Sequence, residues 1–216
     1  GLCFQYLRSY LGDALFDSCM HLYFDNWKFR HPYPDDIKII FESITQKNLS
    51  WFFDDLLKTT RKIDYAIASA KQTSEEEVTN FEIILKNKGG IDGPVSLSGV
   101  DKIGKTLNAK WFDSIGGEKK VSFVCAGCSS IRIDNDQNIP EINQSNNFIR
   151  TSGILRKWDK LHLQFAGGFE KPFTNQIFYL PVLGWNNYDK LMPGVALHNI
   201  FLPEKKFEYV FFLYRL

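Results

Sequence analysis

The sequence lacks any uninterrupted apolar stretch of about 18 residues, the length that a membrane-spanning helix requires. Neither sign of charge is in excess, because 26 lysine and arginine residues face 25 aspartate and glutamate residues, for a net charge of +1. Such a chain has no basic field to attract nucleic acids, so no nucleic-acid partner is expected. Four cysteines in 216 residues are also too few for a scaffold held together by disulfides.

The motifs of the common hydrolases are missing as well. In the H-E-x-x-H arrangement, two histidines one helical turn apart hold zinc and the glutamate acts as the base. The chain's histidines include no such pair, and there is no G-x-S-x-G turn for a serine nucleophile. No catalytic, cofactor-binding or metal-binding residue is therefore predicted in this sequence. The four histidines are His21, His31, His162 and His198.

One pair of cysteines is close enough in sequence to matter. Cys125 and Cys128 match C-x-x-C, which forms half of a zinc site or a redox pair when a second such pair or a following helix is present. Neither accompaniment occurs here. Two interpretations stay open: cysteines that merely flank a tight turn at the end of a strand, or a reversible disulfide.

Helical periodicity fills residues 1–62. Apolar residues recur every three or four positions, and Gly12 followed by Asp13 supplies a helix stop and then an N-cap. The prolines between His31 and Pro34 end the second helical segment. A third segment follows, and then a short one that is capped by Ser50. About four helices are predicted.

The period then changes from 3.6 to 2, which indicates strands. Alternating segments separated by glycine-rich turns continue to about residue 137, at the spacing typical of an immunoglobulin-like β-sandwich. The asparagine-rich stretch 139–147 is interpreted as a linker or surface turn. The predicted fold class is α+β and multi-domain: a helical segment over 1–62, an immunoglobulin-like β-sandwich over 63–137, and a linker with a strand-rich tail over 138–216.

The tail is unusually aromatic. The chain has 19 phenylalanines, many of them in its last third, where a small core cannot hold them all. We therefore expect this region to face a partner or a lipid. Two interpretations remain: residues 148–216 begin an outer-membrane-type β-barrel, or they form a second soluble β-domain. The opening at Gly1 and the unfinished apolar strand at Leu216 lead us to expect a piece of a longer protein.

Five short motifs stand out along the chain: Tyr10–Asp17 (YLGDALFD), Tyr23–Pro32 (YFDNWKFRHP), Asn48–Phe53 (NLSWFF), Ile139–Asn143 (IPEIN) and Gly184–Asp189 (GWNNYD). The first three, in this order, resemble the region that follows the catalytic core of the gluzincin zinc aminopeptidases, the family of membrane alanyl aminopeptidase. The last two resemble a bacterial envelope branch of the same family.

The resemblance implies a parent protein in which two histidines and a glutamate bind zinc and a second glutamate activates water to cleave a peptide substrate. None of these residues maps onto this chain, which begins too late in the family pattern. The tryptophan that the family carries after the third motif is also missing, because Leu56–Thr60 reads LLKTT. The chain itself is expected to bind no zinc.

The function that follows is a non-catalytic C-terminal portion of a zinc-dependent metallo-aminopeptidase-like protein, acting as scaffold, spacer or anchor. A location in the cell envelope, with outer-membrane association through the tail, is expected from the same resemblance. The competing hypothesis is a self-contained binding or structural module without enzymatic activity. Its exposed aromatic residues, such as Trp158, Trp185 and Tyr188, would then bind a sugar or a protein.

Overall fold

The computed structural model divides into two compact units, Gly1–Lys157 and Trp158–Leu216. The residues that the structure describes are 1–75, 78–158, 161–169, 171, 173–188, 190–200 and 207–214. Asp189 of the Gly184–Asp189 motif and the final residues, Arg215 and Leu216, lie outside them.

The first unit opens with four helical elements. They are α1 (Leu2–Leu11), α2 (Asp13–Trp27), α3 (Pro34–Thr45) and the π-helix η1 (Trp51–Leu56). Gly12 separates α1 from α2 with a φ of 83°, a conformation that glycine adopts without steric cost, and its N–H donates to the carbonyl of Arg8 at 2.8 Å. Tyr33 caps α3, where its own N–H donates to the Asp36 carboxylate at 2.6 Å. The helices therefore lie where the periodicity predicts them.

Seven strands complete this unit and form two antiparallel sheets, of order β1-β2-β5 and β4-β3-β6-β7. Periodicity indicated β2 to β6, whereas β1 and β7 were not predicted. The strands are β1 (Tyr65–Glu75), β2 (Val78–Asn87), β3 (Val95–Val100), β4 (Thr106–Phe112), β5 (Glu118–Val124), β6 (Ser130–Ile133) and β7 (Phe148–Arg150).

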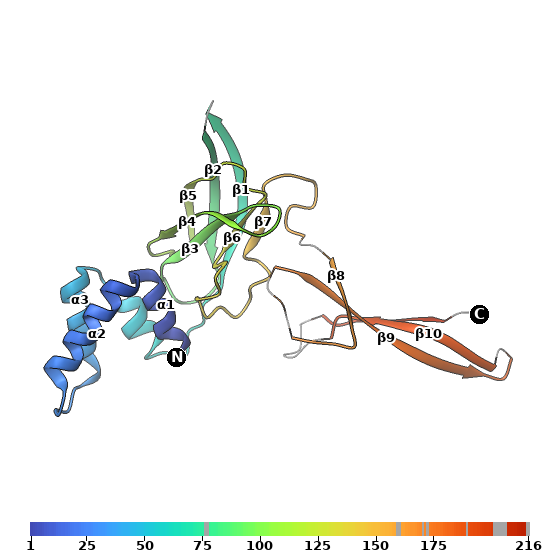
Figure 1. Ribbon diagram of the computed structural model, residues 1–216, viewed down its shortest axis with the longest axis horizontal. Coiled ribbons are helices and arrows are strands. Elements are labelled where there is room, and N and C mark those ends of the chain that lie inside the picture. The colour runs from blue at the N-terminus through green and yellow to red at the C-terminus, as the bar shows by residue number, and fades with distance from the viewer. Residues whose placement is uncertain are drawn as a thin grey trace. The chain divides into compact units, whose positions relative to one another are not determined.

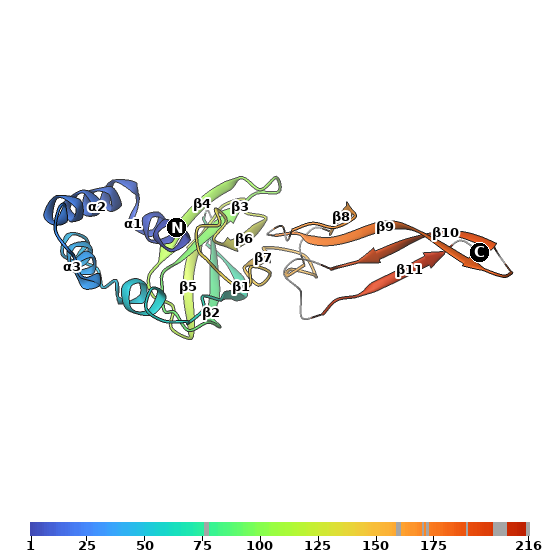
Figure 2. The same ribbon diagram turned by 90° about the horizontal axis from the view of Figure 1, so that it is seen from below.

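One continuous core joins the helices to both sheets. Figure 2 shows α1 beside the strands, with α2 and α3 farther from them. Aromatic rings make the connection: Tyr6 of α1 lies 4.8 Å from the ring of Trp51 and stacks on Trp111 of β4 at 6.2 Å. Offset or edge-on ring pairs at such distances add stabilisation beyond the buried area.

The predicted fold class is wrong. The chain is β-rich: over the residues that the structure describes, helices occur only at the beginning and strands in three sheets follow (Figure 1). The two sheets of the first unit are consistent with a sandwich, but they do not form an immunoglobulin-like domain of their own. The physical reason is that Tyr6 and Trp51 from the helical segment complete the hydrophobic core of the strands. The predicted boundaries at residues 62 and 137 stay a prediction.

The second unit contains a four-stranded sheet of order β11-β10-β9-β8. Strands β8 and β9 run parallel, and the other neighbours are antiparallel. Its strands are β8 (Leu161–Phe165), β9 (Asn175–Asn186), β10 (Lys190–His198) and β11 (Val210–Tyr214). Within the described residues, no helix combines the length and the apolar character needed to cross a bilayer.

Candidate functional site

The four histidines belong to different segments of the chain. His21 and His31 are exposed in the helical segment, and His162 is exposed on β8. His198 of β10 is 7% exposed, and its Nε2 lies 3.1 Å from the carbonyl oxygen of Ala166. In the described part of the chain, no three histidine, cysteine, aspartate or glutamate side chains gather where they could hold a metal. The expectation that this chain contributes no zinc ligand stays a prediction.

Two buried tyrosines, Tyr6 and Tyr65, form hydrogen bonds where the helical segment contacts the strands. The Tyr6 hydroxyl donates to the carbonyl of Pro94, and the Tyr65 hydroxyl donates to the carbonyl of Ile91 at 2.9 Å. Tyr65 also accepts the N–H of Gly93 at 3.0 Å. Burial raises the pKa of both tyrosines. The hydroxyl groups of Tyr6 and Tyr65 are therefore neutral and hydrogen-bonded, and their role is to hold the helical segment against the strands.

A buried carboxyl group lies next to this junction. Glu141 forms a β-bridge with Ile63, and its Oε2 accepts the side-chain amide of Asn147 at 2.8 Å. Its Oε1 is closed off from solvent. Loss of hydration raises the pKa of Glu141 to about 8, although the hydrogen bond from Asn147 opposes the rise. Glu141 is therefore uncharged in the folded protein over much of the neutral range.

Asp134 is a second acid whose pKa is raised by burial, to about 6. The backbone N–H groups of Asn138 and Ile139 donate to its two oxygens at 2.8 and 2.7 Å and oppose that rise. Its negative charge also contributes to the raised pKa of Glu141. These two acids lie beside the tyrosine junction, where their charges also contribute to the raised pKa of Tyr6.

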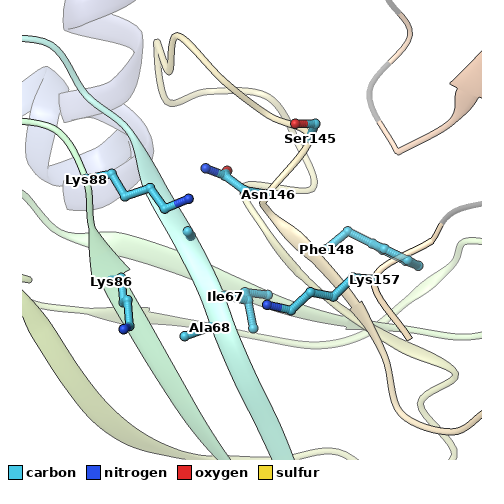
Figure 3. Close-up of a pocket in the computed structure, with 9 residues that line it drawn as sticks. Ile67, Ala68, Lys86, Lys88, Ser145, Asn146, Phe148 and Lys157 are labelled. Atoms are coloured by element: carbon cyan, nitrogen blue, oxygen red, sulfur yellow. The ribbon is translucent and has the colours of Figure 1, made fainter. Parts of the chain in front are cut away.

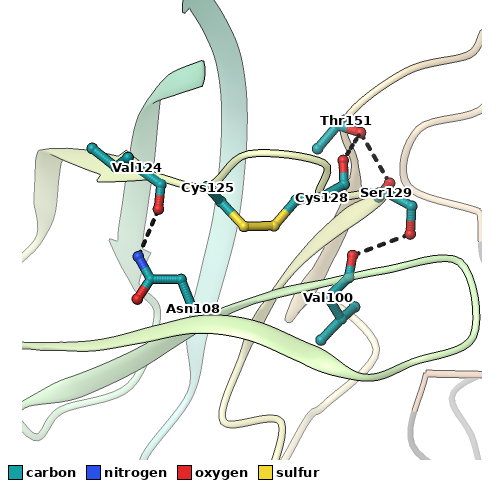
Figure 4. Close-up of a disulfide and its surroundings, with 7 residues drawn as sticks. All are labelled: Val100, Asn108, Val124, Cys125, Cys128, Ser129 and Thr151. Atoms are coloured by element: carbon teal, nitrogen blue, oxygen red, sulfur yellow. Dashed lines mark hydrogen bonds between the residues drawn. A yellow bond between two sulfur atoms is a disulfide. The ribbon is translucent and has the colours of Figure 1, made fainter. Parts of the chain in front are cut away.

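Cys125 and Cys128 form a disulfide that closes the turn between β5 and β6 (Figure 4). Both residues are buried, and Gly99 of β3 lies directly against the two sulfur atoms. Thr151 donates to the carbonyl of Cys128 at 2.8 Å and holds the following turn in place. Of the two interpretations left open, the structure favours a disulfide, and its surroundings give it a packing role.

A pocket of about 350 Å³ opens between β1, the end of β2 and the segment 145–157 (Figure 3). Its volume lies within the usual range for small-ligand sites. Apolar side chains line one part and three lysines another, with no acidic side chain among the lining residues. They are Ala66, Ile67, Ala68, Lys86, Lys88, Ser145, Asn146, Phe148 and Lys157.

No family model matches this chain, and no curated protein matches it. Among solved structures, a similar one is aminopeptidase A of Legionella pneumophila in complex with aspartic acid, at 13% identity and a TM-score of 0.44. The similarity covers 56% of this chain and 14% of that one. This structural neighbour is thus an aminopeptidase, but a likeness of this extent carries no argument about the chain.

The sequence did not point to the pocket or to the buried acids. Both depend on the segment 139–147, which was predicted to be a linker or a surface turn. The structure instead buries Ile139 and Asn147 and places Phe148 in the core. The apolar residues at 139, 148 and 149 were the available signal, but they follow neither the helical nor the strand period.

Proposed function

We propose that the chain is a non-catalytic scaffold portion of a zinc-dependent metallo-aminopeptidase-like protein. The zinc ion and the peptide substrate would bind elsewhere in that protein. The observation that carries the proposal is the exposure of five large apolar side chains of the helical segment, each between 62% and 102% exposed. They are Leu2, Phe24, Phe29, Tyr33 and Ile39. Apolar side chains exposed in such number mark interaction surfaces, and we assign this one to the catalytic part of the same protein.

The residues that carry the family resemblance act as packing residues, which supports the same role. Trp51 and Phe52 of the Asn48–Phe53 motif are buried, and their rings lie 5.5 Å apart. Phe16 of the first motif packs edge-on against Phe41 at 5.6 Å. These side chains maintain the helical segment and its contact with the sheets. Packing contacts of this kind are sufficient for a scaffold role, which requires no catalytic side chain.

The purified chain is expected to retain no stoichiometric zinc after equilibration with the metal and to leave aminoacyl anilides intact. The longer polypeptide that includes the zinc-binding part should bind zinc and show chelator-sensitive hydrolysis.

In that longer protein, Phe24→Asp with Phe29→Asp should lower the melting temperature by several degrees, because a buried apolar contact is worth about 1.5–3 kcal/mol per side chain. Ile103→Asp, at an exposed position of the β3–β4 turn, is the matched control.

Zinc retained by the chain itself, with chelator-sensitive hydrolysis, would contradict the scaffold role. Zinc in neither protein would instead favour the binding-module hypothesis. That hypothesis has its own support in the exposure of Trp158, Trp185 and Tyr188, which are 64%, 66% and 94% exposed.

The second unit supports the proposed envelope location. In its sheet, the register places all odd-numbered residues of the four strands on one face, and none of them is charged. Nine large apolar members of this face are between 38% and 74% exposed. They are Leu161, Leu163, Phe165, Leu183, Trp185, Leu191, Val195, Phe211 and Leu213. The opposite face carries His162, Gln164 and Gln176 on β8 and at the start of β9, and the exposed apolar residues Val210, Phe212 and Tyr214 on β11. We propose that the apolar face associates with lipid.

The protein is expected to float with neutral phosphatidylcholine vesicles in a density gradient. Leu163→Asp combined with Leu213→Asp should reduce the bound fraction at least about ten-fold, because two apolar side chains no longer leave water. His162→Asp, on the opposite face of β8, should leave flotation unchanged. Equal flotation of the two variants would show that this face does not contact lipid.

A further inference from the structure

The hydrogen-bonded pair of Glu141 and Asn147 contains two oxygen atoms that lack a donor. Asn147 is 1% exposed, and its Nδ2 donates to Oε2 of Glu141 at 2.8 Å. Among the described residues, the other oxygen of each side chain, Oε1 of Glu141 and Oδ1 of Asn147, has no hydrogen-bond partner. Buried polar atoms in folded proteins normally have a partner, so a donor must be found for these two acceptors.

Water cannot supply that donor. Neither oxygen is accessible to a water molecule, whether in bulk solvent or in a space inside the fold. A bridging water needs room of its own, whereas a proton does not. A protonated carboxyl group is itself a hydrogen-bond donor. With its proton on Oε1, Glu141 donates to Oδ1 of Asn147 while Nδ2 of Asn147 donates to Oε2, and the two side chains satisfy each other.

The surroundings of Glu141 favour the protonated form. Burial raises its pKa most, to about 8, and the negative charge of neighbouring carboxylates raises it further. The hydrogen bond from Asn147 and a backbone N–H oppose the rise. The neighbouring groups that titrate are all acids. They are Asp134 after β6, Asp64 before β1, Tyr65 of β1 and Tyr6 of α1.

Glu141 and Asn147 also stand at the two ends of a segment that lies along the edge of a sheet. We call residues 141–147 the edge segment, and Figure 3 shows part of it beside β1. Strand β1 is the outer strand of its sheet. The backbone of the edge segment accepts the N–H of Ile67 at 3.0 Å and donates to the carbonyl of Ile63 at 3.1 Å. The acid–amide pair therefore closes a loop that covers backbone groups at this edge.

We propose that the acid–amide pair of Glu141 and Asn147 is a pH-sensitive switch that holds the edge segment against β1. When Glu141 gives its proton to hydroxide, water forms and the hydrogen bond to Oδ1 of Asn147 is lost. A buried carboxylate and an amide oxygen then lack a donor, which costs more free energy than a hydrogen bond contributes. The edge segment opens, the carboxylate becomes hydrated, and the edge of β1 is uncovered. The proposal is independent of the scaffold role, since it rests on this pair alone.

Hydrogen exchange at single backbone amides, followed by NMR, tests the switch. The reporters are the N–H groups of Ile67 and Ile142, which join β1 to the edge segment. Between pH 6 and pH 8, above the pKa of Asp134, their protection factors should fall about ten-fold per pH unit after correction for intrinsic exchange. The reason is that each opening then releases one proton from Glu141. In Glu141→Gln, whose side-chain N–H replaces the O–H, protection should stay constant over this window.

The matched control is Glu118→Gln, which removes an exposed carboxylate and should keep the full pH dependence. Ile83 of β2, the central strand of the sheet, reports global unfolding. Protection at Ile83 should fall with urea, whereas protection at Ile67 should hardly change, because a local opening exposes little surface.

An NMR titration of the Glu141 carboxyl group gives a readout that needs no variant. A neutral carboxyl group at pH 7 is expected, and an ionised one would overturn the switch. So would protection at Ile67 that does not change with pH. Equal urea dependence at Ile67 and Ile83 would show that the edge segment opens only when the whole unit unfolds, and it would overturn the proposal as well.

Discussion

Replacing Glu141 with glutamine is expected to raise the free energy of unfolding by on the order of 4 kcal/mol at pH 9 and to leave it nearly unchanged at pH 4. The folded protein holds the pKa of Glu141 at about 8, well above the ordinary value of 4.5. Glutamine imitates the neutral acid in shape and in its ability to accept the hydrogen bond from Asn147. The substitution therefore removes the free-energy cost of burying a charged carboxylate, and it leaves the shape of the side chain and its hydrogen bond from Asn147 in place.

The direction of this pH dependence follows from the number of protons that the folded and unfolded states bind. Between pH 4.5 and pH 8 the unfolded chain has released the proton of Glu141 while the folded chain still binds it. Stability falls with rising pH wherever the folded state binds more protons, so the unmodified protein loses stability across this window. Asp134, with a pKa raised to about 6, adds a loss of the same sign that begins above its ordinary value of 3.8.

Urea denaturation of both proteins at several pH values between 4 and 9 measures the effect. Glu118→Gln is the matched control, because it removes only an exposed ion pair with Lys86, which is worth about 0–1 kcal/mol. The two curves for Glu141 and its variant should meet at pH 4 and separate steadily above pH 5. Parallel curves would mean that Glu141 is ionised in the folded protein and that burial does not govern its pKa.

Gly99→Ala is expected to lower the free energy of unfolding of the oxidised protein by about 3 kcal/mol. A β-carbon at position 99 would lie 2.3 Å from the sulfur of Cys128 and 2.4 Å from that of Cys125. The disulfide ties the two sulfur atoms together, so neither can rotate away from the new methyl group. Strand β3 or the turn that carries the disulfide must therefore move.

The same substitution should cost less than about 1 kcal/mol when both cysteines are alanine, because the crowding atoms are then absent. The double-mutant cycle compares Gly99→Ala in the two backgrounds by urea denaturation. Gly167→Ala is a control at which a β-carbon meets nothing within 4 Å. An equal loss in both backgrounds would place the strain in the backbone of β3 instead of at the disulfide.

Local pattern predicted the local structure well. The stop at Gly12 and the proline-rich break before α3 depend only on backbone sterics, and the structure has both where the sequence indicates them. Strands β2 to β6 followed from alternation in the same way. By contrast, β1 was missed because its small and polar residues, such as Ala66, Ala68 and Ala70, give no clear alternation.

The candidate pocket was beyond such reasoning. Its lining includes Lys88, Asn146 and Lys157, which lie far apart in the sequence. The residues that flank each of them form no motif that indicates a binding site. Only the bulge at Ala68 and the return of the segment 145–157 along β1 bring them to one cavity. The same is true of Glu141, whose raised pKa comes from burial by residues that no local pattern links to it.

The sequence by itself determined the helices, the strands β2 to β6, the balanced charge and the motifs that resemble a zinc aminopeptidase family. The helices, strands and motifs depend on residues near one another in the chain. Tertiary structure decided that helices and strands share one core and which polar atoms are buried. These outcomes depend on packing between distant segments, because desolvation and close contact act through space and leave no period in the sequence.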